Sequence, residues 1–130
     1  MNLHDIETQW SKDCVIDELK LSSEALNIPK LHSKYHRMLS EERLRLQKHQ
    51  HDHDELEHLL TMYYSKQLTA QEMEYYELPP LDKVYLKQDL NRAVNTHKEM
   101  VQVKQKIGIC QEKTDLLKSI LQQIHQRSFQ

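Results

Sequence analysis

Residues 28–66 read IPKLHSKYHRMLSEERLRLQKHQHDHDELEHLLTMYYSK. This stretch contains no Gly, and its single Pro, Pro29, stands at the second position. Leu, Lys, Arg, Gln and Glu dominate it, and all five residue types favour the α-helix. Because Pro is tolerated in a first turn, we expect one long helix that begins at Pro29 and has Asn27 as its N-cap. At about 1.5 Å per residue this helix would be on the order of 55 Å long, so it needs a second long helix or a partner subunit to bury its apolar side.

The composition of the whole chain also favours helices. The chain has 130 residues with one Gly and three Pro, and 38% of its residues are hydrophobic and 29% charged. β-Branched residues never alternate over the length of a strand, so we predict an all-α fold and a single domain over residues 1–130. The low apolar content is typical of long helices with narrow apolar seams. No apolar run approaches about 18 residues and the two Cys have no CxxC spacing, which indicates a soluble intracellular protein without a membrane segment.

Apolar side chains recur every three or four residues along two segments of the chain. The first seam comprises Leu31, Tyr35, Leu39, Glu42, Leu46, His49, His53, Leu56, Leu60 and Tyr63. The second comprises Leu86, Leu90, Ala93, His97, Met100, Val103, Ile107, Cys110, Thr114, Leu117, Leu121 and Ile124. This spacing predicts a long antiparallel helical hairpin that forms oligomers. Gly108 lies in the second helix, where the close approach of another helix would explain it.

The hairpin divides the single domain into four parts. These are an N-terminal helical arm (residues 1–27), a first long helix (residues 28–66), an acidic crossover (residues 67–84) and a second long helix (residues 85–127). The arm starts with an amphipathic helix over residues 3–12, and because so short a helix is marginal alone, its anchor Trp10 must dock on another surface. The crossover begins with a capping box of Thr69 and Glu72 and ends at Pro79–Pro80, which prevents helix continuation.

The register of the hairpin decides what the histidines of the seams contact. If Tyr64 lies level with Leu86, His53 lies opposite His97, and His49 follows one turn away. Three imidazoles would then share an apolar interface, and protonation would destabilise the fold at acidic pH. An offset register would instead leave each His in contact with water.

The net charge of −2 conceals four blocks of opposite sign. Counted over Lys, Arg, Asp and Glu, residues 1–27 carry −4, residues 28–48 carry +4, residues 49–82 carry −7 and residues 83–130 carry +5. Such blocks either contact nucleic acid and basic partners separately, or neutralise one another when the chain folds.

Basic residues gather on one face of the first long helix, close to a pair of tyrosines. The face comprises Lys34, Arg37, Arg45 and Lys48, and Lys66 follows Tyr63–Tyr64. Basic charge combined with aromatic rings is typical of single-stranded nucleic-acid binding without sequence choice. We therefore predict that these cations contact phosphate and that Tyr64 stacks on a base, whereas Tyr63 fits the hairpin core equally well.

No catalytic or cofactor-binding pattern stands out. The chain has no Gly-rich phosphate loop, no GxSxG motif and no HExxH motif, so we predict no catalytic residues, no enzyme activity and no cofactor. Residues 49–53, HQHDH, place His side chains four apart on a helix, which is a spacing that chelates metals. A solvated helix face is the simpler interpretation, so we predict no metal site.

Scattered identities and one dense run resemble the UvsY family, the recombination mediators of large tailed phages. The dense run is EALNIPKLHSKY at residues 24–35. The scattered identities are Leu3, Asp5, Ile6, Trp10, Lys12–Asp13, Ile16–Asp17, Leu21, the Tyr63–Tyr64–Ser65–Lys66 turn, Lys83–Val84, and VKQKI at residues 103–107. The resemblance extends over nearly all of the chain.

The resemblance implies a non-enzymatic recombination mediator that binds single-stranded DNA. It also implies contacts with the RecA-like phage recombinase and with the phage single-strand binding protein. The mediator would help to load the recombinase onto DNA that the single-strand binding protein coats. A ring-like homo-oligomer in the cytoplasm of the infected bacterial host follows from the same resemblance. Two alternatives stay open on the residues alone: a helical adaptor that binds only proteins, and a His-rich metal-binding helical protein.

Three departures from the family pattern bear on DNA binding and assembly. The family often has Lys and Arg just before the double tyrosine, whereas His58 and Leu60 stand here, so we expect a weaker local charge with His58 still near DNA. The Gly that usually follows the Tyr-Tyr-small turn is replaced by Lys66. Family members usually continue in a helical segment beyond the position of Phe129, so we expect this chain to be shortened at its C-terminus.

Overall fold

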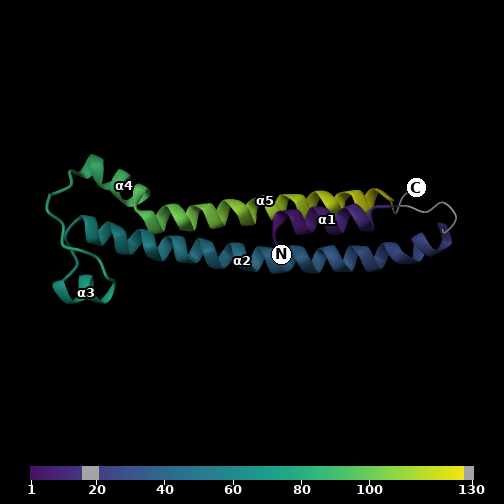
Figure 1. Cartoon of the computed structure of the whole chain (residues 1–130), viewed down its shortest axis with the longest axis horizontal. Coiled ribbons are helices and arrows are strands. Elements are labelled where there is room, and N and C mark those ends of the chain that lie inside the picture. The colour runs from purple at the N-terminus through teal and green to yellow at the C-terminus, as the bar shows by residue number, and fades with distance from the viewer. Residues whose placement is uncertain (16–20, 128–130) are drawn as a thin grey trace. The chain divides into compact units, whose positions relative to one another are not determined.

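The computed structural model describes residues 1–15 and 21–127, and for residues 21–26 it describes the backbone alone. The described residues form helices and no strand, which confirms the all-α prediction (Figure 1). The helices are α1 (Leu3–Asp13), α2 (Leu21–Tyr64), α3 (Ala70–Tyr75), α4 (Lys87–Thr96) and α5 (Lys98–Arg127). They belong to two compact units, one formed by Met1–Gln47 with Ile107–Gln130 and the other by Lys48–Lys106.

The start of the long helix is wrong in the sequence prediction. Helix α2 begins at Leu21, so Pro29 lies inside it and Asn27 is a helical residue, not an N-cap. An interior Pro removes one backbone hydrogen bond and costs about 3 kcal/mol. Good helix formers on both sides, such as Leu26 and Lys30, carry the helix through that position. The stretch at residues 16–20 of the predicted arm lies outside the described residues.

Helix α2 ends at Tyr64 in a left-handed turn centred on Lys66, which has a φ of 61°. The Lys66 N–H donates to the Tyr63 carbonyl at 3.1 Å, and the Gln67 N–H donates to the Met62 carbonyl at 2.8 Å. This pattern is a Schellman motif, whose left-handed position is usually Gly because a Cβ there is sterically disfavoured. Lys66 therefore holds a backbone conformation that is strained for a residue with a Cβ.

The crossover contains the short helix α3, and the predicted capping box is confirmed. The Glu72 N–H donates to Thr69 Oγ1 at 3.1 Å, and the Thr69 N–H donates to Glu72 Oε1 at 3.0 Å. Helix α3 ends in a second left-handed turn at Glu77, with a φ of 56°, where the Leu78 N–H donates to the Met73 carbonyl at 2.8 Å. Leu78 is buried in a core cluster against which Met73 packs.

The predicted second long helix is interrupted, which corrects the expectation of one helix over residues 85–127. His97 has extended backbone angles, a φ of −60° and a ψ of 135°, and it separates α4 from α5. The side chains of Asn95 and Thr96 donate to the carbonyls of Asn91 and Arg92, at 2.8 Å each. Such local side-chain bonds compete with the helix ladder and favour a break at this point.

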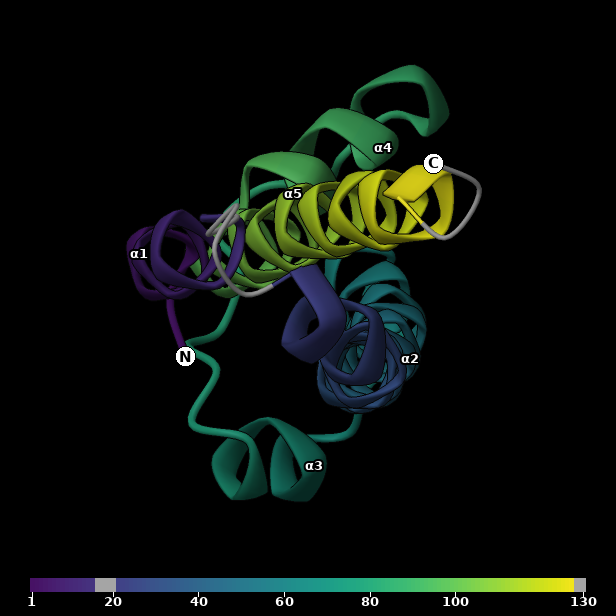
Figure 2. The same ribbon diagram turned by 90° about the vertical axis from the view of Figure 1, so that its right-hand side faces the viewer.

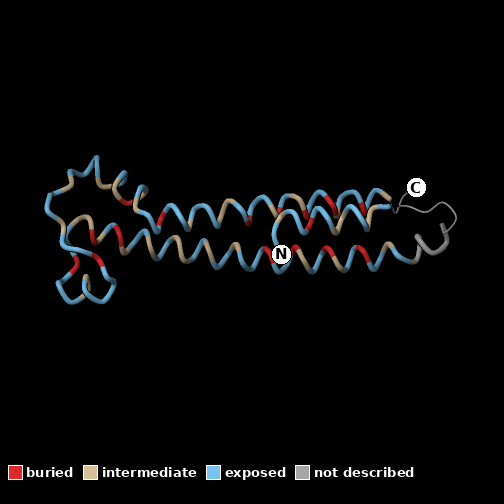
Figure 3. The backbone as a smooth tube through the Cα atoms, in the orientation of Figure 1, coloured by how far each residue is buried: buried red, intermediate tan, exposed pale blue. Residues whose placement is uncertain are grey.

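The first unit packs α1, the N-terminal half of α2 and the C-terminal half of α5 around one core. Its buried residues are Ile6, Leu31, Tyr35, Leu39, Leu117, Ile120 and Ile124. Figures 1 and 2 show α1 beside the C-terminal half of α5, and α5 runs antiparallel to α2 in this unit. Figure 3 shows the buried positions recurring along the facing sides of these helices, as the two seams predict.

Helix α1 is held on the first unit by the anchor that the sequence predicts. The Trp10 ring meets the Tyr35 ring edge-on, with centroids 5.5 Å apart, and the Arg127 guanidinium lies 5.3 Å from the Trp10 ring centroid. Asp13 Oδ2 accepts hydrogen bonds from the Tyr35 hydroxyl at 2.7 Å and from Lys34 Nζ at 2.6 Å. Burial alone would raise the pKa of Asp13, but these two donors and the nearby Lys charges outweigh it and lower that pKa.

The middle of the seam in the first unit is polar. Glu42 is only 2% exposed, and it pairs with Arg45 Nη1 at 2.7 Å and with Lys113 Nζ at 3.6 Å. Cys110 is buried beside it, and burial together with a hydrogen bond to Glu42 raises the pKa of the Cys110 thiol. A buried carboxylate is tolerated only where cations and donors compensate its lost hydration, and Arg45 and Lys113 supply that compensation from the edge of the core.

The second unit packs the end of α2, α3, α4 and the start of α5 around another core. Its buried residues are Leu60, Tyr63, Leu68, Leu78, Val94 and Met100. The Tyr63 hydroxyl donates to the Pro79 carbonyl, which places Tyr63 in the core and ties the crossover to α2.

Gly108, in the first unit, has no described atom within 4 Å of an added Cβ, so no close approach within the described chain explains it.

The predicted cluster of His49, His53 and His97 is wrong because the register differs. The Tyr64 hydroxyl and His97 Nδ1 are 2.8 Å apart, so Tyr64 lies level with His97, not with Leu86. His53 instead pairs with carboxylates of its own helix, Asp54 at 3.1 Å and Glu57 at 3.8 Å.

The lowered pKa of Asp13 predicts that the docking of α1 weakens in acid. A carboxylate with a folded pKa below its unfolded value, near 3.9, stabilises the fold above that value, and the stability is lost as pH falls through the folded pKa. We expect Asp13→Asn to lower the free energy of unfolding by about 1.5 kcal/mol at pH 7. The variant should also lose less stability than the parent between pH 6 and pH 3.

Urea titrations followed by tryptophan fluorescence measure this directly, because Trp10 is the single Trp of the chain and lies on α1. Asp115→Asn, which changes an exposed carboxylate of α5, is the matched control. An equal acid sensitivity of the parent and of Asp13→Asn would contradict the role of this carboxylate.

Candidate nucleic-acid interface

The residues predicted to contact DNA do not form one constellation. Lys34, Arg37 and Arg45 belong to the first unit, whereas Lys48, His58, Tyr64 and Lys66 belong to the second.

Two of the three cations of the first unit that were predicted to contact DNA are paired with carboxylates of that unit. Lys34 Nζ contacts Asp13 Oδ2 at 2.6 Å and Gln9 Oε1 at 2.5 Å, and Arg45 pairs with the buried Glu42. With 3.6 residues per turn, Lys34 and Arg45 lie roughly 75–95° from the middle of the seam, whereas Arg37 lies about 150° from it. The first two cations can therefore reach carboxylates at the seam, and Arg37 faces outward.

Arg37 is the predicted cation of the first unit whose charge stays available. It is exposed and makes no ion pair with a described residue. With Lys30 and Ser33 it lines a surface hollow of about 590 Å³ on α2. The sequence analysis did not select Lys30, although its spacing from Arg37, two helical turns, was the signal that could have identified it.

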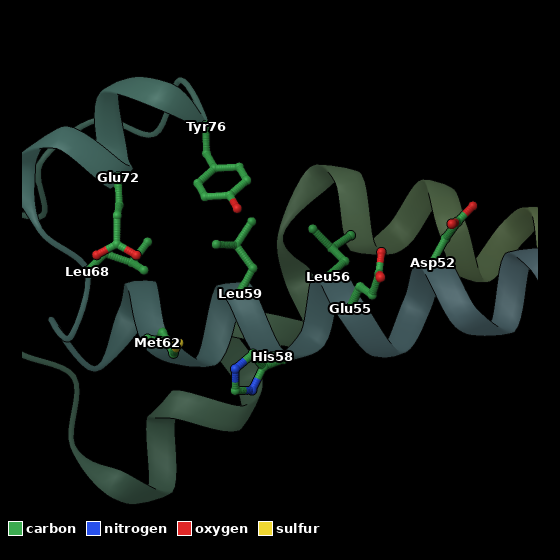
Figure 4. A pocket seen from close by; sticks show the side chains of 9 residues that line it. All are labelled: Asp52, Glu55, Leu56, His58, Leu59, Met62, Leu68, Glu72 and Tyr76. Atoms are coloured by element: carbon green, nitrogen blue, oxygen red, sulfur yellow. The ribbon is translucent and has the colours of Figure 1, made fainter.

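His58 lies in acidic surroundings. It lines a hollow of about 520 Å³ between α2 and α3, together with Asp52, Glu55, Glu72 and Tyr76 (Figure 4). The floor of this hollow is apolar, and Figure 4 shows Tyr76 reaching down from α3 toward Leu59. Three carboxylates around one hollow repel phosphate, so this part of the second unit is unsuited to nucleic acid.

Tyr64 is half-buried and is part of an aromatic cluster. Its ring meets Tyr63, Tyr85 and His97 edge-on, with centroid distances of 4.9, 5.1 and 5.9 Å. Burial, followed by the neighbouring Tyr85 and Tyr63 hydroxyls, raises the pKa of Tyr64, so this hydroxyl stays protonated near neutral pH.

Lys48 and Lys66 are exposed and make no ion pair with a described residue.

A hollow that the sequence analysis missed lies beside this aromatic cluster. It has a volume of about 600 Å³ and is formed by Tyr64 and by residues 83–97. Lys83, Tyr85 and Arg92 line it, and Lys83 Nζ lies 4.7 Å from the Tyr85 ring centroid. The sequence signal was the Lys-Val-Tyr run at the start of the basic C-terminal block, which the prediction divided between the crossover and the second helix.

His and acidic side chains lie next to one another along α2. No group of three or more His, Cys, Asp or Glu in the described part of the chain is placed to hold a metal ion. The histidines instead form pairs along α2, such as His51 with Glu55 at 3.0 Å.

Within the same described ranges, no helix combines the length and apolar character needed to cross a membrane.

Comparison with known proteins finds one family and one solved structure. Residues 9–130 match the family described as "Recombination, repair and ssDNA binding protein UvsY". The crystal structure of the bacteriophage T4 recombination mediator protein UvsY is similar in fold, with a TM-score of 0.87 and 22% sequence identity over 99% of this chain and 89% of that one. No curated protein matches at a significant level.

The strained turn at Lys66 predicts that stability and DNA binding respond separately to substitution. We expect Lys66→Gly to raise the free energy of unfolding by about 0.5–1 kcal/mol, because Gly adopts a positive φ without steric cost. Lys66→Ala keeps the Cβ and should bring no gain. If Lys66 contacts phosphate, both variants lose the same charge and should lower the salt dependence of single-stranded DNA binding equally.

Urea unfolding of the three proteins, each also titrated with a labelled oligonucleotide, separates the two effects. A Gly variant no more stable than the Ala variant would show that Lys66 carries no backbone strain.

Proposed function

The chain belongs to the UvsY family of recombination, repair and single-stranded-DNA-binding proteins, and we propose that it helps to load a RecA-like recombinase onto DNA coated by single-strand binding protein. The proposed contact with DNA is independent of base sequence and involves no catalysis. The observation that carries the proposal is the match of the family over residues 9–130, together with exposed cations that make no ion pair with a described residue.

We place the phosphate contacts on Arg37, Lys48 and Lys66. These three are exposed and make no ion pair with a described residue, whereas Lys34 and Arg45 neutralise Asp13 and Glu42. A paired cation contributes little to phosphate binding, because the gain in the complex is offset by the loss of its internal partner. His58 contributes less than these cations, because its surroundings are acidic.

The proposed assembly is a ring-like homo-oligomer that acts in the cytoplasm of the infected bacterial host. Leu44 and Ile109, large apolar side chains of the first unit, are more than half exposed, and such an assembly would cover them. The proposed protein partners are the phage recombinase and the phage single-strand binding protein.

The alternative of an adaptor that binds only proteins is favoured by one feature, the acid-rimmed apolar hollow between α2 and α3. Carboxylates around an apolar floor suit a basic protein segment with an apolar anchor, and they do not suit DNA. The two functions differ in their response to oligonucleotides, so DNA binding by the purified chain separates them.

We expect the purified chain to bind a labelled oligo-dT and a mixed-sequence single strand with similar affinity. The affinity should fall steeply as salt rises, because each neutralised phosphate releases counterions and contributes about 0.7 to the logarithmic salt slope. Fluorescence anisotropy at several salt concentrations measures both quantities. Absence of binding at low salt would leave the adaptor as the function.

Arg37→Gln and Arg45→Gln form a matched pair for the same measurement. Both remove one Arg from α2, but Arg37 faces solvent and Arg45 is bound to Glu42. We expect Arg37→Gln to lower the salt slope by about 0.7 and Arg45→Gln to change it little. Equal slopes for the parent and Arg37→Gln would remove Arg37 from the interface.

A further inference from the structure

We infer that the hollow formed by Tyr64 and residues 83–97 binds one nucleotide of single-stranded DNA, with the base against Tyr85 and the phosphate between Lys83 and Arg92. The inference rests on the proposed function and adds to it the location of a base-binding subsite. The sequence analysis did not predict a DNA contact for Lys83, Tyr85 or Arg92.

The chemistry of the lining suits a nucleotide. Aromatic rings and cations line the same hollow, with Lys83 Nζ over the Tyr85 ring, and its volume of about 600 Å³ lies within the range of small-ligand sites. Tyr85 is half-buried, and its ring stands at 82° to the Tyr64 ring. Stacking of bases on such rings tolerates every base, which agrees with binding independent of sequence.

The cations of the hollow are available for phosphate. Lys83 lies against the Tyr85 ring, and neither it nor Arg92 makes an ion pair with a described residue. Asp89 is the acidic residue in the lining, so the hollow carries a net charge of +1 from its Lys, Arg and Asp. This sign is opposite to that of the hollow between α2 and α3, where Asp52, Glu55 and Glu72 gather.

The wall of the hollow is fixed by contacts that do not involve its cations. Tyr64 joins the end of α2 to the break between α4 and α5 through its hydroxyl, 2.8 Å from His97 Nδ1. The extended backbone at His97 interrupts the helix beside the hollow. A site held in this way is formed before the ligand binds, so less free energy is lost in ordering it.

Two apolar side chains beside the rings face solvent. Val84 is 74% exposed and Leu86 is 61% exposed, and both line the hollow. Leu86 was predicted to lie in the second seam, but it precedes α4 as its N-cap residue. A sugar or the face of a base would cover apolar surface that the described chain leaves open.

The test uses anisotropy of a labelled oligo-dT with the full chain and the variants Tyr85→Leu and Arg92→Gln. Tyr85→Leu should weaken binding about tenfold without changing the salt slope, because a base–ring stack is lost and no charge is removed. Arg92→Gln should weaken binding and lower the salt slope by about 0.7. Tyr85→Phe, which keeps the ring, should bind as the parent does and shows that the effect is not misfolding.

Two matched controls and one altered probe make the result specific. Tyr75→Leu removes a ring of α3 that is 80% exposed, and Lys106→Gln removes an exposed cation of α5; neither residue lines the hollow. An oligonucleotide of abasic sites carries the phosphates without bases, so Tyr85→Leu should bind it as tightly as the parent does.

Binding of oligo-dT by Tyr85→Leu within twofold of the parent would overturn the subsite, as would an equal loss in Tyr75→Leu or on the abasic strand. These outcomes leave the proposed function standing, because the parent still binds DNA. Failure of the parent itself to bind either strand would overturn the function and the subsite together.

Discussion

A shortage of apolar side chains constrains every part of this chain. With 38% hydrophobic residues, the seams that join the helices cannot be filled by apolar groups alone. Glu42, Cys110 and Thr114 occupy buried positions in the first unit, and Asp13 fixes α1 through Tyr35 and Lys34. Glu42 and Asp13 each have a cation beside them, because an unpaired charge away from water is strongly destabilising.

The same constraint decides which cations remain for nucleic acid. Lys34 and Arg45 compensate internal carboxylates, so a face that has four cations in the sequence offers fewer to a phosphate backbone. Arg37 stays available because its helix position points away from the seam. In the second unit the acidic side chains gather between α2 and α3, and the cations Lys83 and Arg92 lie with aromatic rings at a separate hollow.

The periodicity of the sequence predicts burial well and backbone breaks poorly. Every residue of the first seam, from Leu31 to Tyr63, is buried or half-buried, and in the second seam Leu86 is the exposed exception. Side-chain spacing reports which face of a helix is covered, and that property is local. The break at His97 depends on competing hydrogen bonds from Asn95 and Thr96 and on a contact with the distant Tyr64. Side-chain spacing does not report these contacts, so the register of the hairpin could not be predicted from it.

The candidate site was predictable in kind but not in place. The combination of basic and aromatic residues indicated single-stranded DNA, and the family match agrees with that role. The partner of Lys34 could not be anticipated, because Asp13 is 21 residues away and reaches it only when α1 docks. Tyr85 and Arg92 were overlooked because they lie on either side of the start of α4, where no helical period connects them.

Photo-crosslinking of the chain to an oligonucleotide that carries 4-thiothymidine tests most directly where the bases bind. Mass spectrometry of the digested complex identifies the peptide attached to the base. The account predicts crosslinks in the peptide over residues 84–87, which contains Tyr85, and none in the acidic stretch that lines the hollow between α2 and α3. Crosslinks confined to residues 52–62 or 68–76, the stretches that line the acidic hollow, would contradict it.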